Sequence, residues 1–83
     1  MTAAPTYVLV AEDFSGRADE DVLLARLGTS ALAVERTTRT VTARGETRTV
    51  PGLRITVQGG FDGVRNTVAH GIAVGAGFVT YID

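Results

Sequence analysis

Residues 31–58 read ALAVERTTRTVTARGETRTVPGLRITVQ, and this stretch decides the fold. The stretch is rich in the β-branched residues Val, Ile and Thr, and in parts of it apolar residues alternate with polar ones. Near its middle, Gly45 and Glu46 suit a two-residue turn with glycine at the first central position. The stretch is therefore predicted to form one long β-hairpin. A turn at these residues predicts the following facing pairs: Arg44 with Thr47, Thr42 with Thr49, Val41 with Val50, and Val34 with Val57.

This pairing sorts the side chains of the hairpin onto two faces, because successive strand residues point to opposite sides. The apolar set on one face is Leu32, Val34, Leu53, Ile55 and Val57, and the polar set on the other is Glu35, Thr37, Arg39, Arg48, Arg54, Thr56 and Gln58. No bulge is needed. The core-side positions between Thr38 and Leu53 are mostly Thr and Arg, so this part, here called the arm, is predicted to extend into solvent. Pro51 suits an edge or a bend better than a central ladder.

The segments on either side of the hairpin predict two strands and two helices. TYVLVAED (residues 6–13) and FVTYID (residues 78–83) have the β-branched and aromatic character of strands. Between the first strand and the hairpin, residues 19–27 carry helix signals: Asp19 as N-cap, acids in the first turn, and Gly28 as the C-terminal stop.

The second helix is predicted over residues 62–77. Val64, Val68 and Ile72 recur at helical spacing between Asp62 as N-cap and Gly77 as stop. Three further glycines lie within this range, and each costs about 1 kcal/mol against alanine in a helix interior. The alternative is a helix that ends near His70, followed by a hairpin that includes residues 72–83.

The resulting order is strand, helix, strand, strand, helix, strand. This is the ferredoxin-like split βαβ arrangement of the α+β class, with a four-stranded antiparallel sheet, two helices on one face, and the other face open. Residues 1–83 are predicted to form a single domain, since the chain is short and 45% of it is apolar. Many unrelated functions share this fold, so it predicts a geometry and no particular activity.

Composition narrows the function classes. Cysteine is absent, which excludes disulfides, thiolate metal sites and thiol nucleophiles. No basic region precedes the first apolar stretch and no apolar run reaches membrane-spanning length, which predicts a soluble, unsecreted, cytoplasmic protein. Every basic residue is arginine, beside much Ala, Gly, Val and Thr, a bias typical of GC-rich genomes.

No catalytic, cofactor or metal site is predicted. His70 is the single histidine, and its helical neighbours Asn66 and Thr67 provide no nucleophile or metal-ligand set. The segment VLVAEDFSGRADEDVLLARLG resembles the ligand-loop region of small amino-acid-binding domains of the ACT type. That resemblance implies a ligand role for Glu12 and Asp13, whereas the residues themselves favour a plain strand end and turn. A tight turn is also favoured over an anion site for Gly59 and Gly60.

The candidate interaction residues lie on the predicted open face and on the arm. They are Tyr7, Arg36, Arg39, Thr42, Arg44, Arg48, Thr49, Arg54 and Tyr81. Tyrosine and arginine are enriched at binding hot spots. The sequence leaves open whether the first strand presents Tyr7 with Leu9, or Val8 with Val10, on that face.

Two functions are compatible with these residues. The favoured hypothesis is a small non-catalytic interaction or assembly subunit, for example of a phage or actinobacterial particle, that binds other protein chains or itself. The alternative is an anion- or nucleic-acid-binding module that uses the arginines of the hairpin. Phosphate contact fits those arginines. However, RNA-recognition modules carry stacking aromatics on their third strand, and LRITVQ (residues 53–58) has none.

Overall fold

The computed structural model describes residues 5–59 and 68–83 of the chain. Its elements are β1 (Thr6–Glu12), α1 (Glu20–Leu27), a short 3₁₀ turn η1 (Gly28–Ser30), β2 (Ala31–Ala43), β3 (Glu46–Gln58), α2 (Val68–Gly75) and β4 (Val79–Ile82). The strands form one antiparallel sheet in the order β2-β3-β1-β4. The predicted α+β class, with a four-stranded antiparallel sheet and two helices, is confirmed.

Helix α1 begins and ends where the sequence predicts. The Asp19 side chain accepts a hydrogen bond from the Val22 amide at 3.1 Å, which caps the helix N-terminus. Gly28 follows the last helical residue with a positive φ of 55° and ends the helix. The buried residues Leu23 and Leu27 face the sheet.

Helix α2 covers Val68–Gly75, so the alternative with a hairpin over residues 72–83 is wrong. Gly77, with φ 95°, lies in the turn after the helix, and β4 follows directly. The predicted N-cap Asp62 and the first predicted turns of this helix, with Val64, lie outside the described residues. Ala69 and Ala73 are the buried residues of α2, and their small side chains let the helix approach the core closely.

The hairpin is present, but its predicted register is wrong by two residues. The turn residues are Arg44 and Gly45, with φ of 54° and 78°, in place of Gly45 and Glu46. Two successive positive φ angles match the twist of the flanking strands, which favours this turn even though arginine is an uncommon residue there. The observed pairs are Ala43 with Glu46, Thr42 with Thr47, Thr40 with Thr49, Arg39 with Val50, and Val34 with Ile55.

The predicted division into two faces nevertheless holds for β3, because a shift of two residues preserves the alternation of side chains. Leu53, Ile55 and Val57 are buried. On β2, by contrast, Leu32 and Val34 are 53% and 44% exposed, because β2 is the edge strand of the sheet. The register also shifts between Ala31 and Ala33, where the sequence predicted no bulge.

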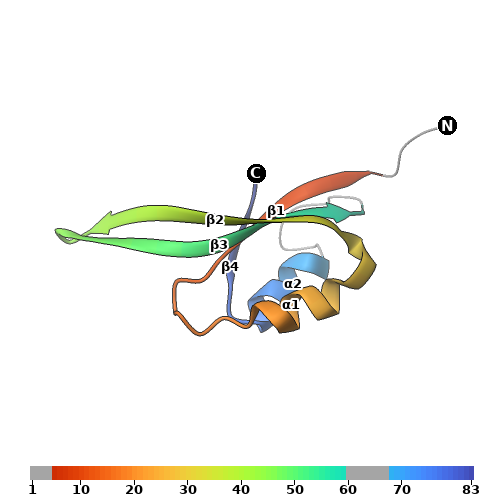
Figure 1. Ribbon diagram of the computed structural model, residues 1–83, viewed down its shortest axis with the longest axis horizontal. Helices are drawn as coiled ribbons and strands as arrows, with labels where there is room; N and C mark the ends of the chain where they lie inside the picture. The colour runs from red at the N-terminus through yellow and green to blue at the C-terminus, as the bar shows by residue number, and fades with distance from the viewer. Residues whose placement is uncertain (1–4, 60–67) are drawn as a thin grey trace.

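The core lies between the helices and one face of the sheet. Both helices lie on the same side of it in Figure 1. The core residues from β1 are Leu9 and Ala11, and Tyr7 is packed against them. Val8 and Val10 pair with Thr56 and Arg54 on the other side. Of the two arrangements that the sequence left open, the first strand therefore presents Val8 and Val10 on the open face, and the candidate interaction residue Tyr7 packs against the core.

The hairpin extends well beyond the helices, as Figure 1 shows, and gives the molecule a length of 51 Å against 21 Å in the other two directions. Pro51 lies within β3, a central strand, contrary to the expectation of an edge or a bend. A proline is tolerated here because its backbone points toward β1 and not toward β2. Just past the end of β1, the Pro51 carbonyl accepts a hydrogen bond from the Asp13 amide at 2.9 Å. The missing N–H therefore leaves the pairing with β2 intact.

Candidate functional site

A buried polar group joins β1 to the hairpin. The guanidinium of Arg39 donates two hydrogen bonds of 2.8 Å to the carboxylate of Glu12. Glu12 is 3% exposed and is the buried charged residue of the described part of the chain. These bonds raise the pKa of Arg39 above its ordinary value, although burial opposes the increase. A bidentate bond of this kind holds both side chains in one geometry.

Phe14 lies next to this pair, in the loop between β1 and α1. The guanidinium carbons of Arg39 and Arg48 lie 5.9 Å and 5.6 Å from the centre of its ring, within the range of cation–π contact. Arg48 also donates a hydrogen bond of 2.7 Å to the Phe14 carbonyl. Glu12, Phe14, Arg39 and Arg48 are called the loop cluster below. The cluster ties the loop to the arm.

The loop itself is organised by Asp13. Its carboxylate accepts hydrogen bonds from the amide of Gly16 at 2.8 Å, from the amide of Ala18 at 3.3 Å and from the hydroxyl of Ser15 at 3.2 Å. Aspartate commonly stabilises turns in this way. Both acids to which the ACT-type resemblance gave a ligand role therefore have partners within the chain. This geometry is that of the plain strand end and turn that the residues favoured.

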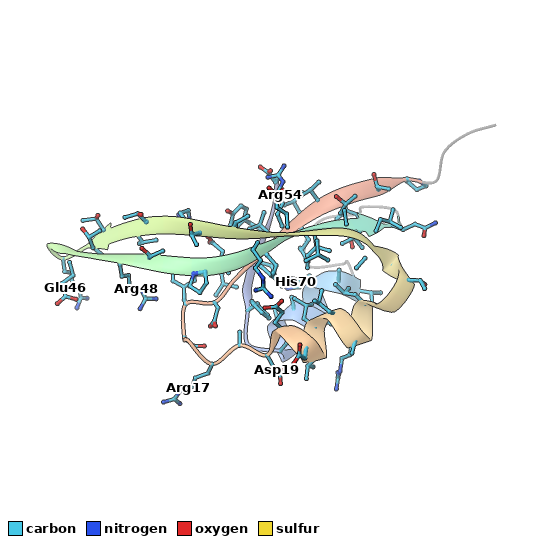
Figure 2. The ribbon with its side chains drawn as sticks, in the orientation of Figure 1. Arg17, Asp19, Glu46, Arg48, Arg54 and His70 are labelled. Carbon is cyan, nitrogen blue, oxygen red and sulfur yellow. The ribbon has the colours of Figure 1, made fainter. Side chains whose placement is uncertain are left out.

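The other arginines near the hairpin base are also bonded within the chain. Arg36 donates hydrogen bonds of 2.7 Å and 2.5 Å to Glu20 of α1, which raise its pKa. Arg54 forms an ion pair with Asp83. Figure 2 shows Arg54 on the upper side of the sheet, with Arg48 and Glu46 on the lower side of the arm. Since Arg48 and Arg54 share one parity of β3, the twist of the strand turns that face through the length of the hairpin.

The candidate residues therefore do not all lie on one surface, because Arg36 bonds to α1 on the helix side of the sheet and Tyr7 packs against the core. Arg39 and Arg48 meet in the loop cluster, Thr42 bonds to Thr47 at 3.0 Å near the arm tip, and Tyr81 lies opposite Val10 on the open face. Arg44 occupies the turn, and Thr49 pairs with Thr40 farther back. The arm is also less solvated than predicted, since Val50 is 1% exposed.

The open face is partly apolar. Val79 and Tyr81 of β4 are 53% and 41% exposed, whereas Val10, between Tyr81 and Arg54 in the sheet, is 4% exposed. An exposed tyrosine beside an exposed valine is a surface on which another protein can pack. The patch is small, because the ion pair between Arg54 and Asp83 lies on the same face.

The outer edge of β2 is a long unpartnered edge within the described residues. The strand spans Ala31–Ala43 and pairs with β3 on one side, while no other described strand pairs with its second side. The backbone groups of Pro51 point toward β1 and not toward β2. Thr38, which pairs with Pro51, therefore directs its N–H and C=O away from β3, to the outer edge of β2. Alternate residues do the same, and this outward set comprises Val34, Arg36, Thr38, Thr40 and Thr42.

Two hollows flank these features. One, of about 520 Å³, lies along the arm and is lined by Phe14, Val41, Ala43, Arg44, Glu46 and Arg48. The other, of about 370 Å³, lies beside Tyr7 between the helices and the sheet, and it borders residues that flank the part of the chain left undescribed. Both are open and neither contains a converging set of buried polar groups among the residues that line it.

His70 forms a hydrogen bond of 2.7 Å with the Thr80 hydroxyl, which links α2 to β4. Within residues 5–59 and 68–83, no three His, Asp or Glu side chains gather in a way that could hold a metal ion. Among the same residues, no helix has the length and apolar character required to cross a membrane.

Sequence reasoning missed Phe14 and the role of Glu12. A single aromatic residue in a polar loop, directly after an acid at a strand end, was the available signal. The partners of both residues come from the arm. Arg39 is 27 positions from Glu12 and Arg48 is 34 positions from Phe14, so no local pattern reveals these contacts.

Comparison of the chain with models of protein families, with curated proteins and with solved structures gives no match.

Proposed function

We propose that this chain is a small non-catalytic interaction or assembly subunit that binds other protein chains through its hairpin, with the open face as a second contact. One observation carries the proposal. Among the described strands, the thirteen-residue strand β2 forms an edge of the sheet, and its alternate backbone groups point away from β3. Such an edge is a template for another strand, and natural proteins protect it unless it is used.

The outer edge of β2 has three charged residues, Glu35, Arg36 and Arg39, but it lacks other features that normally protect sheet edges. Residues 34–43 of β2 contain no proline and no lysine, and the register shift affects only the first residues of the strand, between Ala31 and Ala33. The opposite edge strand, β4, is protected by being short, with four residues. The asymmetry between the two edges favours β2 as the binding edge.

The strand order β2-β3-β1-β4 supports assigning this sheet to the ferredoxin-like split βαβ arrangement. In that arrangement one strand of the hairpin forms an edge of the sheet, and the helices cover one face and leave the other face open. The arginine-only composition supports a GC-rich bacterium or its phage as the origin, with the subunit assembling in the cytoplasm.

The partners of the arginines argue against the alternative of anion or nucleic-acid binding. Arg36, Arg39 and Arg54 are paired with carboxylates, and Arg48 is bonded to the loop. A guanidinium held by a carboxylate contributes little to phosphate binding, because the local charge is already neutralised. Arg44, at the exposed turn, is the arginine of the arm for which no such partner is found in the described residues.

Light scattering on the purified chain over a range of concentrations tests the proposal. We expect a mass above that of the monomer that increases with concentration. Thr42→Lys and Thr49→Lys should lower this mass, whereas Thr42→Ser and Thr49→Ser should leave it unchanged. A chain that stays monomeric at its highest soluble concentration would overturn self-assembly as its function.

The alternative function is tested on the same preparations. A single-stranded oligonucleotide should bind negligibly at physiological salt. Tight binding that weakens steeply with salt, and that weakens further in an Arg44→Gln and Arg48→Gln variant, would favour the anion-binding module instead.

A further inference from the structure

We propose that the occupant of the β2 edge is a second copy of this chain, paired antiparallel through β2 about Thr37, so that two sheets join into one of eight strands. This inference rests on the proposed function and names its partner and register. The backbone of the edge, the charges on it and the exposed apolar residues at its base point to this partner.

Two copies that pair through the same edge are related by a two-fold axis perpendicular to the sheet. Such a pairing matches each residue with one of the same parity, so that both side chains lie on the same face. Thr37 is the middle residue of β2 (Ala31–Ala43). A register centred on Thr37 therefore pairs the full length of both strands and leaves neither end without a partner.

Charge selects this register from its neighbours. With Thr37 on the axis, Glu35 lies opposite Arg39 of the second copy, and the ion pair occurs twice. Centring the pairing on Glu35, Arg36 or Arg39 places two like charges directly opposite each other, which is destabilising. A register centred on Thr38 opposes neither like nor unlike charges, so it lacks the stabilisation of the two ion pairs.

The side chains of this pair have the capacity for the new contact. Glu35 is exposed and has no hydrogen bond or ion pair with the described residues. Arg39 uses Nε and Nη2 for Glu12, and its side chain remains 52% exposed. Glu12 does not use Nη1, so Arg39 retains donors for a second carboxylate. Arg39 would then bridge Glu12 of its own chain and Glu35 of the second copy.

The backbone geometry agrees with this register. The outward-pointing residues Val34, Arg36, Thr38 and Thr40 become hydrogen-bonded pairs with Thr40, Thr38, Arg36 and Val34 of the second copy. An antiparallel ladder of this length provides about eight backbone hydrogen bonds from these residues. Glu35 and Arg39 then form non-hydrogen-bonded pairs, in which opposing side chains lie closer together.

The pairing also covers exposed apolar side chains. Val34 lies opposite Thr40 of the second copy, and Leu32 lies near Thr42, so the arm of each chain runs along the base of the other. Leu32 and Val34 are 53% and 44% exposed in the single chain. The arm, which extends beyond the helices of its own chain in Figure 1, gains a neighbour along its outer edge.

A single-cysteine experiment tests the register directly, because the chain contains no cysteine. In the proposed dimer the two Thr37 residues face each other with Cα atoms about 4.5 Å apart, within the range that a disulfide spans. Thr37→Cys should therefore form a covalent dimer under mild oxidation. Val41→Cys is the control on the same strand and face, since its two copies lie about 27 Å apart in this register.

A second variant tests the use of the edge without relying on a disulfide. Thr38→Pro removes an N–H that points away from β3, so the chain should keep its fold but lose the dimer. Thr38→Val retains the N–H and should dimerise normally. Glu35→Arg, which faces Arg39 with a like charge, should weaken the dimer roughly tenfold. Circular dichroism and the urea midpoint check that each variant folds.

The outcomes separate this inference from the proposed function. Cross-linking of Thr37→Cys but not of Val41→Cys, with loss of the dimer in Thr38→Pro, supports the inference. An oligomer that persists in a folded Thr38→Pro chain, or that fails to cross-link through Thr37→Cys, overturns it and leaves the proposed function standing. A wild-type chain that is monomeric at every concentration overturns this inference together with self-assembly, and leaves only binding to a different protein chain within the proposed function.

Discussion

Arg39 of the edge strand holds the buried carboxylate of Glu12 through two hydrogen bonds of 2.8 Å. The pair connects β2 to β1 across β3, over Gly52, which has no side chain to occupy the space between them. The base of the arm is therefore attached to the sheet by side chains as well as by its own backbone.

Removing Arg39 should destabilise the chain more than removing Arg36. Each arginine holds a carboxylate with two hydrogen bonds, but Glu12 has a side chain 4% exposed and Glu20 one that is 32% exposed. Arg39→Met leaves a buried charge without a partner, whereas in Arg36→Met the carboxylate is hydrated. Urea denaturation should show the larger loss for Arg39→Met. Adding Glu12→Gln to Arg39→Met should recover part of the loss, and equal midpoints for the two single variants would contradict this explanation.

Gly52→Ala should lower the free energy of unfolding by about 1–3 kcal/mol. A Cβ at this position would lie 2.9 Å from the carbonyl oxygen of Ala11 and 3.1 Å from the hydroxyl of Thr37. The first contact is with backbone, which cannot move without disturbing the pairing of β1 with β3. Thermal or urea unfolding measures the change. An alanine variant as stable as the parent would show that the sheet adjusts at this point.

Gly71→Ala should have the opposite effect and stabilise the chain by about 0.5–1 kcal/mol. Gly71 lies in the middle of α2 and is exposed, and within 4 Å a methyl group added to it would meet no atom of the described residues outside its own part of the helix. The substitution therefore adds helix propensity without a clash. The pair of glycine variants separates the effect of space from the effect of backbone entropy, and a decrease in stability for Gly71→Ala would contradict the helical environment assigned to it.

Asp19→Ala should lower the free energy of unfolding by about 1 kcal/mol, because the side chain accepts a hydrogen bond from the Val22 amide at the start of α1. Asp19→Ser keeps an acceptor at the N-cap and should retain most of the stability. Chemical denaturation of both variants checks the difference. Similar losses for alanine and serine would show that the carboxylate acts by its charge and not as a cap.

The local part of the fold was predictable from the sequence because its signals are local. Asp19 and Gly28 bound α1, and the alternation of apolar residues in β3 identified its buried face. The turn was missed by one residue because Arg44 adopts a positive φ, which its residue type does not predict. The pairing of β3 with β1 extends from Thr6 to Glu12 and contributes to the hairpin register through contacts that no local pattern contains.

The candidate site was predicted less well. The sequence singled out the arginines as contacts for a partner, and the structure bonds Arg36, Arg39, Arg48 and Arg54 within the chain. Their acceptors are Glu20, Glu12, the Phe14 carbonyl and Asp83, which are distant in the sequence. A charged residue in a strand pattern identifies a solvent-facing position, but it does not identify which group folds back to meet it.

By itself, the sequence determined the order of the elements, the limits of α1 and the apolar face of β3, since each depends on neighbours within a few residues. Only the tertiary structure decided the register of the hairpin, the inward direction of Tyr7 and the partners of the arginines. Those features depend on which strands lie next to each other. Backbone pairing across the sheet, together with the burial of Glu12, fixes them through contacts between residues far apart in the chain.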